Sequence, residues 1–498
     1  MTAVLAAVAG RPVKLHLSRE EEFVTITKHA SRIRLRTGVR ADGTIVARQS
    51  TCYFNTGAYA DIGPRLIKNG GYGTGGPYAI PHVWVDSYAV YTNVPPAGAF
   101  RGYGIPQAAW AYETQMDMIA ERLGMDPYRL RARNLLADGD TLMTGEPMSD
   151  AHFPELLRSA ADGIGWDFDG WDTPPQRQGS LVRGKGLACI IKGTVTPSTS
   201  TAAARLNDDG SLDVLTSSVE MGQGVKTALA ILAAERLPLP VRSIMVSEPD
   251  TAFVPYDEGT SSSRASFSMG NAVGTAVDEV RRQLVELAAE LLEAAPGDLE
   301  CVDRMVRVRG VPDQAVDYGQ VVRKSRSGNL LGNATFKTEG GLDPETGQGI
   351  GSVHWHQAAG AAEVEVDLDT GHVRVLDYHA AVYAGRIINP VQAELQTEGN
   401  VAFGVGQAFF EEMLYDHGQL TNGNLGDYMV ASCKDMPAHL GLSILEHPEA
   451  HEIHGIGETS LPPVAPAIGN AVYRATGIRI TDLPITPDKL LTALHTQH

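Results

Sequence analysis

The sequence predicts an α+β fold in which antiparallel hairpins and mixed sheets pack against helices. Three segments alternate apolar and polar residues around a turn dipeptide, at Asp42-Gly43, Asp209-Gly210 and Thr370-Gly371. Each hairpin runs into a glycine-containing loop, and helical stretches follow at 224–237 and 271–294. The second stretch has apolar residues at helical spacing and an acidic outer face. This order of elements differs from the repeated strand–helix–strand units of a doubly wound parallel sheet.

The length of 498 residues allows several domains. Proline, glycine, glutamine and charged residues cluster at 145–180, so we expect one domain over 1–160 and a second over 161–498. The first 15 residues lack a basic leader, and we interpret them as a truncated or buried helix and not as a signal peptide. No apolar run approaches the roughly 20 residues of a membrane span.

Charge and cysteine content narrow the class of function. Acidic residues outnumber basic ones by 59 to 41, which argues against binding of a nucleic acid backbone. The four cysteines form no CxxC pair, so we expect free buried thiols in a reducing, cytoplasmic compartment and no iron–sulfur or zinc site in this chain. They are Cys52, Cys189, Cys301 and Cys433. The histidines show no metal-ligand spacing apart from His354 and His356.

Two glycine-containing loops carry groups suited to an anionic ligand. In "NVPPAGAFRGYGIPQ", Arg101 precedes a helix expected near Pro106, where a guanidinium suits an anion or a polarised oxygen. In "EMGQGVKT", Gly222 and Gly224 free backbone N–H groups at a helix start, and Gln223 adds an amide. The alternatives are a surface arginine and an ordinary strand-to-helix turn.

Two further loops combine hydroxyl, guanidinium and carboxylate groups. "YDEGTSSSRASFSMGNAV" places five serines and Arg264 before a long helix, which is typical of a phosphate cradle or of an N-capping polar loop. In "HEIHGIGETSLPPVAPAIGNAVYRATG", Glu458 is a candidate general base, and a low-dielectric pocket is expected to raise its pKa. Glu458 is otherwise a helix-capping or solvated acid. Without a cluster of metal ligands, the four loops favour a large organic cofactor that carries a phosphate.

Taken in order, these loops resemble the molybdopterin-binding subunit of the xanthine dehydrogenase/aldehyde oxidase family of molybdenum hydroxylases. The matching segments run from about residue 3 to about residue 492 and include "GAFRGYGIPQ", "EMGQGVKT", "SSRASFSMGNAV", "AGRIINPVQAELQTEGNVAFGVGQAFFEE" and "GIGETSLPPVAPAIGNAVYRATGIRITDLPITPDKLL". The resemblance implies a molybdopterin, in bacteria often its cytosine dinucleotide, held without a side-chain ligand to the molybdenum.

The resemblance also implies roles for single residues. Glu458 matches the catalytic base that takes a proton from the oxygen nucleophile at the molybdenum. Arg101, with its neighbours, matches the loop close to the metal and the substrate. The implied molybdenum-proximal residues are Ala99, Phe100 and Arg101, and the implied cofactor-binding residues are Gly222, Gln223, Gly224, Arg264, Ala265, Ser266, Gln396 and Gly457.

The resemblance further implies partners. The family's subunit begins upstream of the region matched here, with a domain that carries a GGxFGxK loop, so we expect a partner polypeptide to supply that half or the sequence to be truncated. Electrons are expected to leave through an iron–sulfur subunit carrying [2Fe-2S] clusters and an FAD subunit.

The expected activity is insertion of a water-derived oxygen at an electron-poor carbon of an N-heterocycle, purine- or pyridine-like. Asn69 stands where purine-oxidising members carry an arginine before "YAIP", which favours a heterocycle other than xanthine. The alternatives are an aldehyde oxidoreductase of the same family and a non-catalytic cofactor-binding or assembly remnant.

Overall fold

The computed structural model describes residues 1–447 and 452–496, and the α+β prediction is confirmed. Each of the three predicted turns joins two antiparallel strands: β2 to β3, β8 to β9, and β17 to β18. Their glycines, Gly43, Gly210 and Gly371, have φ values of 89°, 78° and 70°, the left-handed region that glycine tolerates best. The turn dipeptides therefore predicted the hairpins for the correct physical reason.

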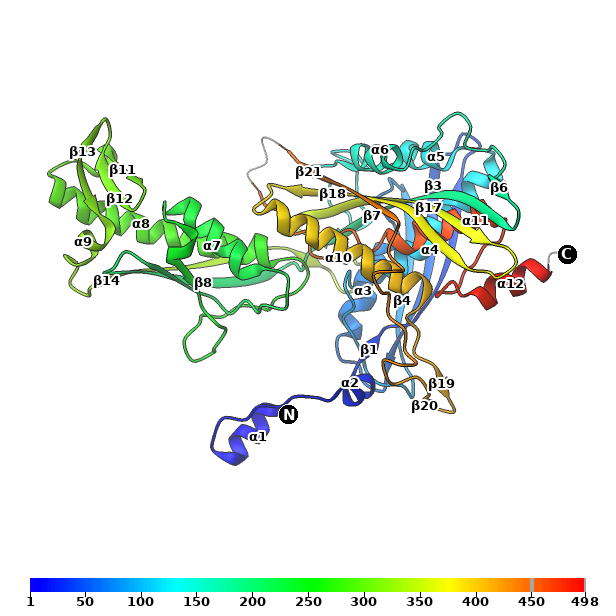
Figure 1. Ribbon diagram of the computed structural model, residues 1–498, viewed down its shortest axis with the longest axis horizontal. Helices are drawn as coiled ribbons and strands as arrows, with labels where there is room; N and C mark the ends of the chain where they lie inside the picture. The colour runs from blue at the N-terminus through cyan, green and yellow to red at the C-terminus, as the bar shows by residue number, and fades with distance from the viewer. Residues whose placement is uncertain (448–451, 497–498) are drawn as a thin grey trace.

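A five-stranded sheet forms the centre of the larger part of the molecule (Figure 1). Neighbouring strands are antiparallel except β18 and β21, which run parallel. In spatial order they are β21 (His439–Glu446), β18 (Val373–Gly385), β17 (Trp355–Asp367), β7 (Leu181–Gly193) and β6 (Arg177–Gln178).

Helix α11 (Val464–Thr476) lies directly on strand β7 because two glycines of that strand leave room for it. A Cβ atom on Gly184 would lie 2.4 Å from the Ala471 carbonyl oxygen, and one on Gly186 would lie 2.3 Å from that of Ala467. Backbone therefore packs against backbone, which fixes the position of the loop that leads into α11.

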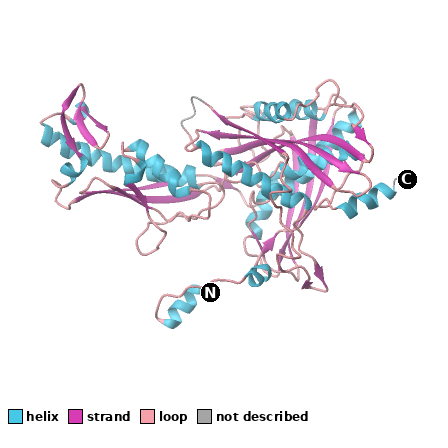
Figure 2. Cartoon of the chain, in the orientation of Figure 1, coloured by secondary structure: helices cyan, strands magenta, loops and turns pink. Residues whose placement is uncertain are grey.

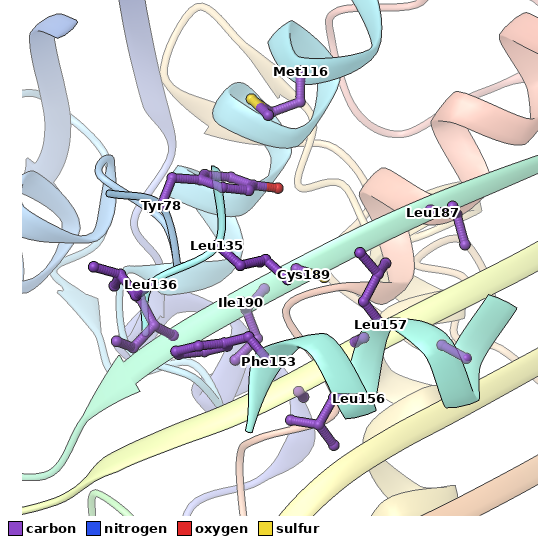
Figure 3. Packing of buried hydrophobic residues seen from close by; sticks show 14 of the residues in the cluster. Tyr78, Met116, Leu135, Leu136, Phe153, Leu156, Leu157, Leu187, Cys189 and Ile190 are labelled. Atoms are coloured by element: carbon purple, nitrogen blue, oxygen red, sulfur yellow. The ribbon is translucent and has the colours of Figure 1, made fainter. Parts of the chain in front are cut away.

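One hydrophobic core joins the sheet to the helices of the N-terminal part (Figure 3). Helix α6 (Phe153–Gly163) contributes Phe153, Leu156 and Leu157, and β7 contributes Leu187 and Ile190. This core crosses the expected domain boundary near residue 160, and that boundary stays a prediction. Residues before it form the sheet β2 (Ser31–Val39), β3 (Ile45–Gly57) and β4 (His82–Tyr91), with helices α3 (Gly63–Gly73), α4 (Ile105–Leu123) and α5 (Pro127–Asn134).

A second lobe, on the left in Figure 1, has its own hydrophobic core. Helices α7 (Val225–Arg236) and α8 (Gly270–Leu292) confirm the two helices expected after glycine-containing loops. They accompany the sheet β10 (Ile244–Val246), β9 (Leu212–Leu215), β8 (Ser198–Asn207) and β14 (Asn329–Thr338), and beyond it β11 (Leu299–Val302), β12 (Met305–Val308), β13 (Val311–Asp317) and α9 (Tyr318–Val322).

The remaining elements are short or peripheral (Figure 2). Helix α10 (Pro390–Phe409) is the exception, since it packs on α11 beside the sheet. The others are α1 (Thr2–Ala9), α2 (Arg19–Thr25), α12 (Pro487–Thr496), and the strand pairs β1 (Thr27–Lys28) with β5 (Ala97–Gly98), β15 (Gly341–Leu342) with β16 (Gly349–Ile350), and β19 (Tyr415–Asp416) with β20 (Gln419–Leu420).

Of the two alternatives for the N-terminal helix, burial is wrong and truncation stays a prediction. Helix α1 forms without a buried residue, and its apolar side chains are exposed apart from the half-buried Ala6. The expectation that all four cysteines are buried is also wrong. Cys433 is exposed, whereas the other three cysteines are buried, and all four are free thiols. None of the helices in the described residues is long and apolar enough to cross a membrane.

We predict that Arg131→Met lowers the free energy of unfolding by about 3–5 kcal/mol, because it leaves a buried carboxylate without its partner. The fully buried Arg131 guanidinium lies 2.7 Å from both the Glu113 and the Asp117 carboxylates. The measurement is urea unfolding followed by circular dichroism. The control is Arg282→Met, which removes a half-exposed guanidinium from surface pairs worth about 0–1 kcal/mol. Equal losses in the two variants would contradict the prediction.

Candidate functional site

The Glu458 carboxylate is held by three donors from three separate segments. The Lys192 ammonium lies 2.9 Å from Oε2, and the Ser263 hydroxyl donates to the same oxygen over 3.0 Å. The backbone N–H of Gly102 donates to Oε1 over 3.2 Å. Only 18% of the Glu458 side chain is exposed, so these donors fix both its position and its direction.

The expectation of a raised pKa for Glu458 is wrong. Burial does raise the pKa of this carboxyl, but the Lys192 ammonium and the hydrogen bonds from Gly102 and Ser263 together outweigh burial and lower it below its ordinary value. Glu458 is therefore ionised at neutral pH, which is the protonation state that a general base requires.

Lys192 was missed by the sequence analysis. It lies in "LACIIKG", near the end of strand β7, and its side chain is only 3% exposed. A lysine in an otherwise apolar buried strand is a usable signal, because a buried ammonium needs a carboxylate or several acceptors. Its other acceptor is the Gly193 carbonyl oxygen at 3.1 Å.

Arg101 joins three of the predicted site segments. Its Nε donates to the Gly457 carbonyl oxygen over 2.6 Å, and one Nη donates to the Gln396 side-chain oxygen over 2.8 Å. Burial lowers the pKa of Arg101 to about 10, against the opposing effect of Glu458, so the guanidinium stays charged at neutral pH. Arg101, Gln396, Gly457 and Glu458 thus lie together, and their predicted roles toward a cofactor stay predictions.

Phe100 and Ala99 lie next to this group with different exposure. The half-buried Phe100 ring packs edge-on against Phe403 of α10, with centroids 6.2 Å apart, and the Lys28 ammonium lies 4.3 Å from the Phe100 ring centroid. Ala99 is exposed. Their proximity to a bound molybdenum stays a prediction.

The "GQG" turn lies against helix α10. A Cβ atom on Gly224 would lie 2.1 Å from the side-chain nitrogen of Gln392, so the turn and the helix are in contact. Gln392 stands one helical turn before Gln396, on the same face of α10, which connects the turn to the Arg101 group. The Gln223 amide is used inside the turn, where it donates to the Val219 carbonyl oxygen over 2.8 Å.

The same turn already binds one anionic group. The backbone N–H groups of Gly222, Gly224 and Lys226 donate to the Glu220 carboxylate over 3.0, 2.9 and 3.4 Å. Three N–H groups that converge on one carboxylate at the start of a helix form an anion cradle. The chemistry of these donors fits the acidic group of an anionic cofactor, and in the structure they are used by Glu220.

The serine-rich loop divides into a site-facing part and a structural part. The Ser263 backbone passes so close to Gly455 that a Cβ atom there would lie 1.8 Å from its carbonyl oxygen. The Arg264 guanidinium points elsewhere, to Asp257 at 2.8 Å and to the Ser200 hydroxyl at 2.6 Å. Arg264 anchors the loop, and its role in cofactor binding stays a prediction.

Ala265 and Ser266 open a π-helical turn (Ala265–Met269) that leads into α8, and both are half-buried. Their contact with a pterin phosphate stays a prediction. Among the described residues, no three His, Cys, Asp or Glu side chains are arranged to hold a metal ion. His451, the first residue of the stretch that contains Glu458, lies outside the described residues.

Fold and site define a protein in which backbone amides, one guanidinium and one carboxylate from distant loops surround a site for an anionic cofactor. Residues 1–135 and 160–437 match two models of a molybdopterin cofactor-binding domain. The chain belongs to this molybdopterin cofactor-binding family and is of the molybdenum-binding large-subunit type found in xanthine dehydrogenases and aldehyde oxidoreductases.

Known relatives match nearly all of the chain. It is 34% identical to the xanthine dehydrogenase molybdenum-binding subunit of Escherichia coli O157:H7, over 99% of this chain and 66% of that protein. The structure of quinoline 2-oxidoreductase from Pseudomonas putida 86 superposes with a TM-score of 0.86 at 26% identity, over 99% of this chain and 65% of that one. Aldehyde oxidoreductase from Desulfovibrio gigas gives a TM-score of 0.86 at 27% identity, over 99% and 52%. The chain therefore spans less than two thirds of each relative.

We predict that Lys192→Met lowers the free energy of unfolding by about 3–5 kcal/mol at pH 7, because Glu458 is left buried without its cation. Loss of the ammonium raises the pKa of Glu458, so the carboxyl is protonated in the folded state as the pH falls. The deficit relative to wild type therefore shrinks towards pH 4. Urea unfolding at both pH values measures it.

Lys185→Met is the matched control for Lys192→Met, since Lys185 lies on the same strand with 32% of its side chain exposed and 3.8 Å from Glu363. Lys192→Met combined with Glu458→Gln is expected to recover most of the loss. A deficit that does not change with pH would contradict the assignment of the ion pair.

Proposed function

We propose that this chain is the catalytic molybdopterin-binding part of a molybdenum hydroxylase. The reaction inserts a water-derived oxygen at an electron-poor carbon of an N-heterocycle, purine- or pyridine-like. One observation carries the proposal, namely the buried Glu458 carboxylate held ionised beside Arg101 and Gln396. Burial of a carboxylate is costly, and the ionised state in which this one is held is the state that a general base requires.

The residues that would hold the cofactor are those of the converging loops. The amides of the "GQG" turn would bind an acidic group, and Arg101 and Gln396 offer further polar contacts. Within the described residues the hydrogen bonds of Arg101 use Nε and one Nη, which leaves the other Nη for a ligand. When bound, the molybdenum centre supplies the two-electron redox chemistry and the water-derived oxygen.

Glu458 acts on the oxygen nucleophile by accepting its proton at a carboxylate oxygen. Oε2 is shared by Lys192 and Ser263, whereas Oε1 is held by one backbone N–H. We assign proton acceptance to Oε1, because it has the larger number of free lone-pair directions. Gly457 has no atom closer than 3.6 Å to an added Cβ, so the backbone beside the base leaves space for a ligand.

We infer the substrate class from the names of the relatives and from the residue at position 69 of helix α3. Two of the three compared proteins are named for heterocycles, xanthine and quinoline. Asn69 lies half-buried on helix α3, where the resemblance places an arginine in purine-oxidising members. An amide does not grip a polarised carbonyl as a guanidinium does, which favours a pyridine- or quinoline-like substrate over xanthine.

Electrons then have to leave through other subunits. We assign [2Fe-2S] clusters and FAD to partners, and a segment equivalent to the unmatched part of the relatives completes the site. The cofactor is a molybdopterin, with the cytosine dinucleotide as the bacterial form. The three free thiols buried in the chain fit a reducing, cytoplasmic compartment.

We predict that Glu458→Gln lowers kcat by about 10²–10⁴-fold while molybdenum content is retained, because the amide keeps the shape but accepts no proton. Steady-state assays with an artificial electron acceptor give the rate, and elemental analysis gives the metal content. The control is Glu398→Gln, an exposed acid on α10 close to Gln396. Turnover and metal content that both survive would exclude Glu458 as the base.

We predict that quinoline is turned over with a kcat/KM about tenfold or more above that of benzaldehyde and of xanthine. The same acceptor assay with the three compounds measures the ratios. Aldehyde oxidoreductase is the second candidate, because the Desulfovibrio gigas enzyme superposes as well as the quinoline enzyme does. A preference for benzaldehyde would decide for it, and molybdenum binding without turnover of any compound would indicate a cofactor-binding remnant.

A further inference from the structure

A row of buried histidines extends from the ion pair at the base. His356, His354 and His454 are 0%, 6% and 6% exposed. The centroids of the His356 and His354 rings are 4.8 Å apart, and those of His354 and His454 are 4.7 Å apart. The first pair meets edge-on, at an interplanar angle of 78°, and the second pair is tilted at 35°, so the rings follow one another in contact.

Strand pairing places the first histidine beside Lys192. His356 of β17 is the direct partner of Lys192 of β7 in the antiparallel register, so both side chains point to the same face of the sheet. His354 lies just before β17 begins at Trp355, and its ring contacts that of His356. His454 joins from the loop that leads to Glu458, where its N–H donates to the Ala384 carbonyl oxygen over 3.0 Å.

The outer end of the row reaches an exposed carboxylate. His454 Nε2 lies 3.7 Å from one Asp150 oxygen, and His152 Nε2 lies 2.8 Å from the other. The Asp150 side chain is 46% exposed and that of His152 is 15% exposed. The row therefore connects a buried ion pair with solvent.

The ring nitrogens of this row have an unusual lack of protein partners. Within the described residues, both nitrogens of His354 and of His356, and Nδ1 of His454, are buried without a well-formed hydrogen bond, although the Gly455 backbone lies close enough to the His356 ring to raise its pKa slightly against the effect of burial. Buried polar atoms in proteins nearly always have a partner, so five exceptions side by side need an explanation. Phenylalanine would fill the same space without burying unpaired ring nitrogens. Among the described residues, no three His, Cys, Asp or Glu side chains are arranged to hold a metal ion, so metal binding does not explain the histidines.

We propose that His356, His354 and His454 form the route by which protons leave the Lys192–Glu458 ion pair for Asp150 and solvent. This inference rests on the proposed function, which has Glu458 accept a proton in each turnover. Burial, together with the Lys192 charge, lowers the pKa of His354 and His356, so both rings are neutral. A neutral imidazole accepts a proton at one nitrogen and releases one at the other.

Each group on the route gives up one proton for every proton that it accepts. Rotation of the protonated Glu458 carboxyl group first brings its proton from the Oε1 side to the Oε2 side, which Lys192 contacts. Lys192 then gives a proton to His356 and takes the one held by Glu458, which returns Glu458 to the carboxylate. His356 passes a proton to His354, His354 passes one to His454, and His454 passes one to Asp150, which releases it to solvent. One proton enters and one leaves, and no electron moves. Ring rotation, or an ordered water between two rings, closes each gap.

The test measures protonation of Glu458 directly and needs no turnover. After a rapid pH drop on the purified chain with the subunits that co-purify, the infrared carboxylate bands follow the protonation of Glu458, assigned by their loss in Glu458→Gln. We expect His356→Phe and His354→Phe to slow this step at least tenfold. His379→Phe is the matched control, because His379 lies in the same sheet, bonded to Ser443, outside the row.

Protonation as fast in both row variants as in wild type would overturn the proposal. His356→Gln guards against misfolding, since its amide keeps hydrogen bonds but carries no proton, and it is expected to be as slow as the phenylalanine variant. Added imidazole is expected to restore the rate in His354→Ala, whose cavity admits it. A row variant that loses turnover but protonates Glu458 at the wild-type rate would count against the histidine row and leave the proposed function standing. A wild-type chain that protonates Glu458 at the expected rate but turns over no substrate would count against the proposed function.

Discussion

The ion pair between Lys192 and Glu458 is the interaction on which the arrangement of the site depends. It connects the end of strand β7 to the loop before α11. The same carboxylate accepts hydrogen bonds from the Arg101 loop and from the serine-rich loop. Three donor segments, each more than 150 residues away from Glu458 in the sequence, thus meet at its side chain. A buried charge with a single partner is costly, so each additional donor both stabilises the carboxylate and orders the segment that supplies it.

Close backbone contacts hold this ion pair in place. Gly184 and Gly186 let α11 lie on β7, and Gly455 lets the loop pass the Ser263 carbonyl oxygen. Any side chain at these positions would push apart the two elements that carry Lys192 and Glu458. These glycines therefore position the elements of the site, whereas an added Cβ atom at Gly457 or Gly222 would meet little or nothing, which leaves the backbone open there.

The hairpins, the helices and the candidate site residues could be predicted from the sequence, but the direction of the Glu458 pKa shift could not. Hairpins and helices depend on turn dipeptides and on 3.6-residue periodicity, which are local, and they were predicted correctly. The resemblance selected Arg101, Gln396 and Glu458, whose segments lie side by side in the structure, and their roles toward a cofactor stay predictions. The direction of the Glu458 pKa shift was wrong because the cation that decides it comes from a strand 266 positions away, and strand pairing beyond a hairpin is not readable from spacing.

The occupied anion cradle at Glu220 bears on how a cofactor would enter. The N–H groups of Gly222 and Gly224 cannot serve Glu220 and an acidic group of a ligand at once. Hydrogen bonds from these amides lower the pKa of Glu220, so the carboxylate is charged and has to move away when an anion binds. A site that satisfies its own donors in this way stays ordered without a ligand, and the energy of displacing Glu220 is subtracted from the affinity for the cofactor. At Arg101 one Nη has no hydrogen bond among the described residues, so under the proposed function this guanidinium binds a ligand without first displacing a carboxylate.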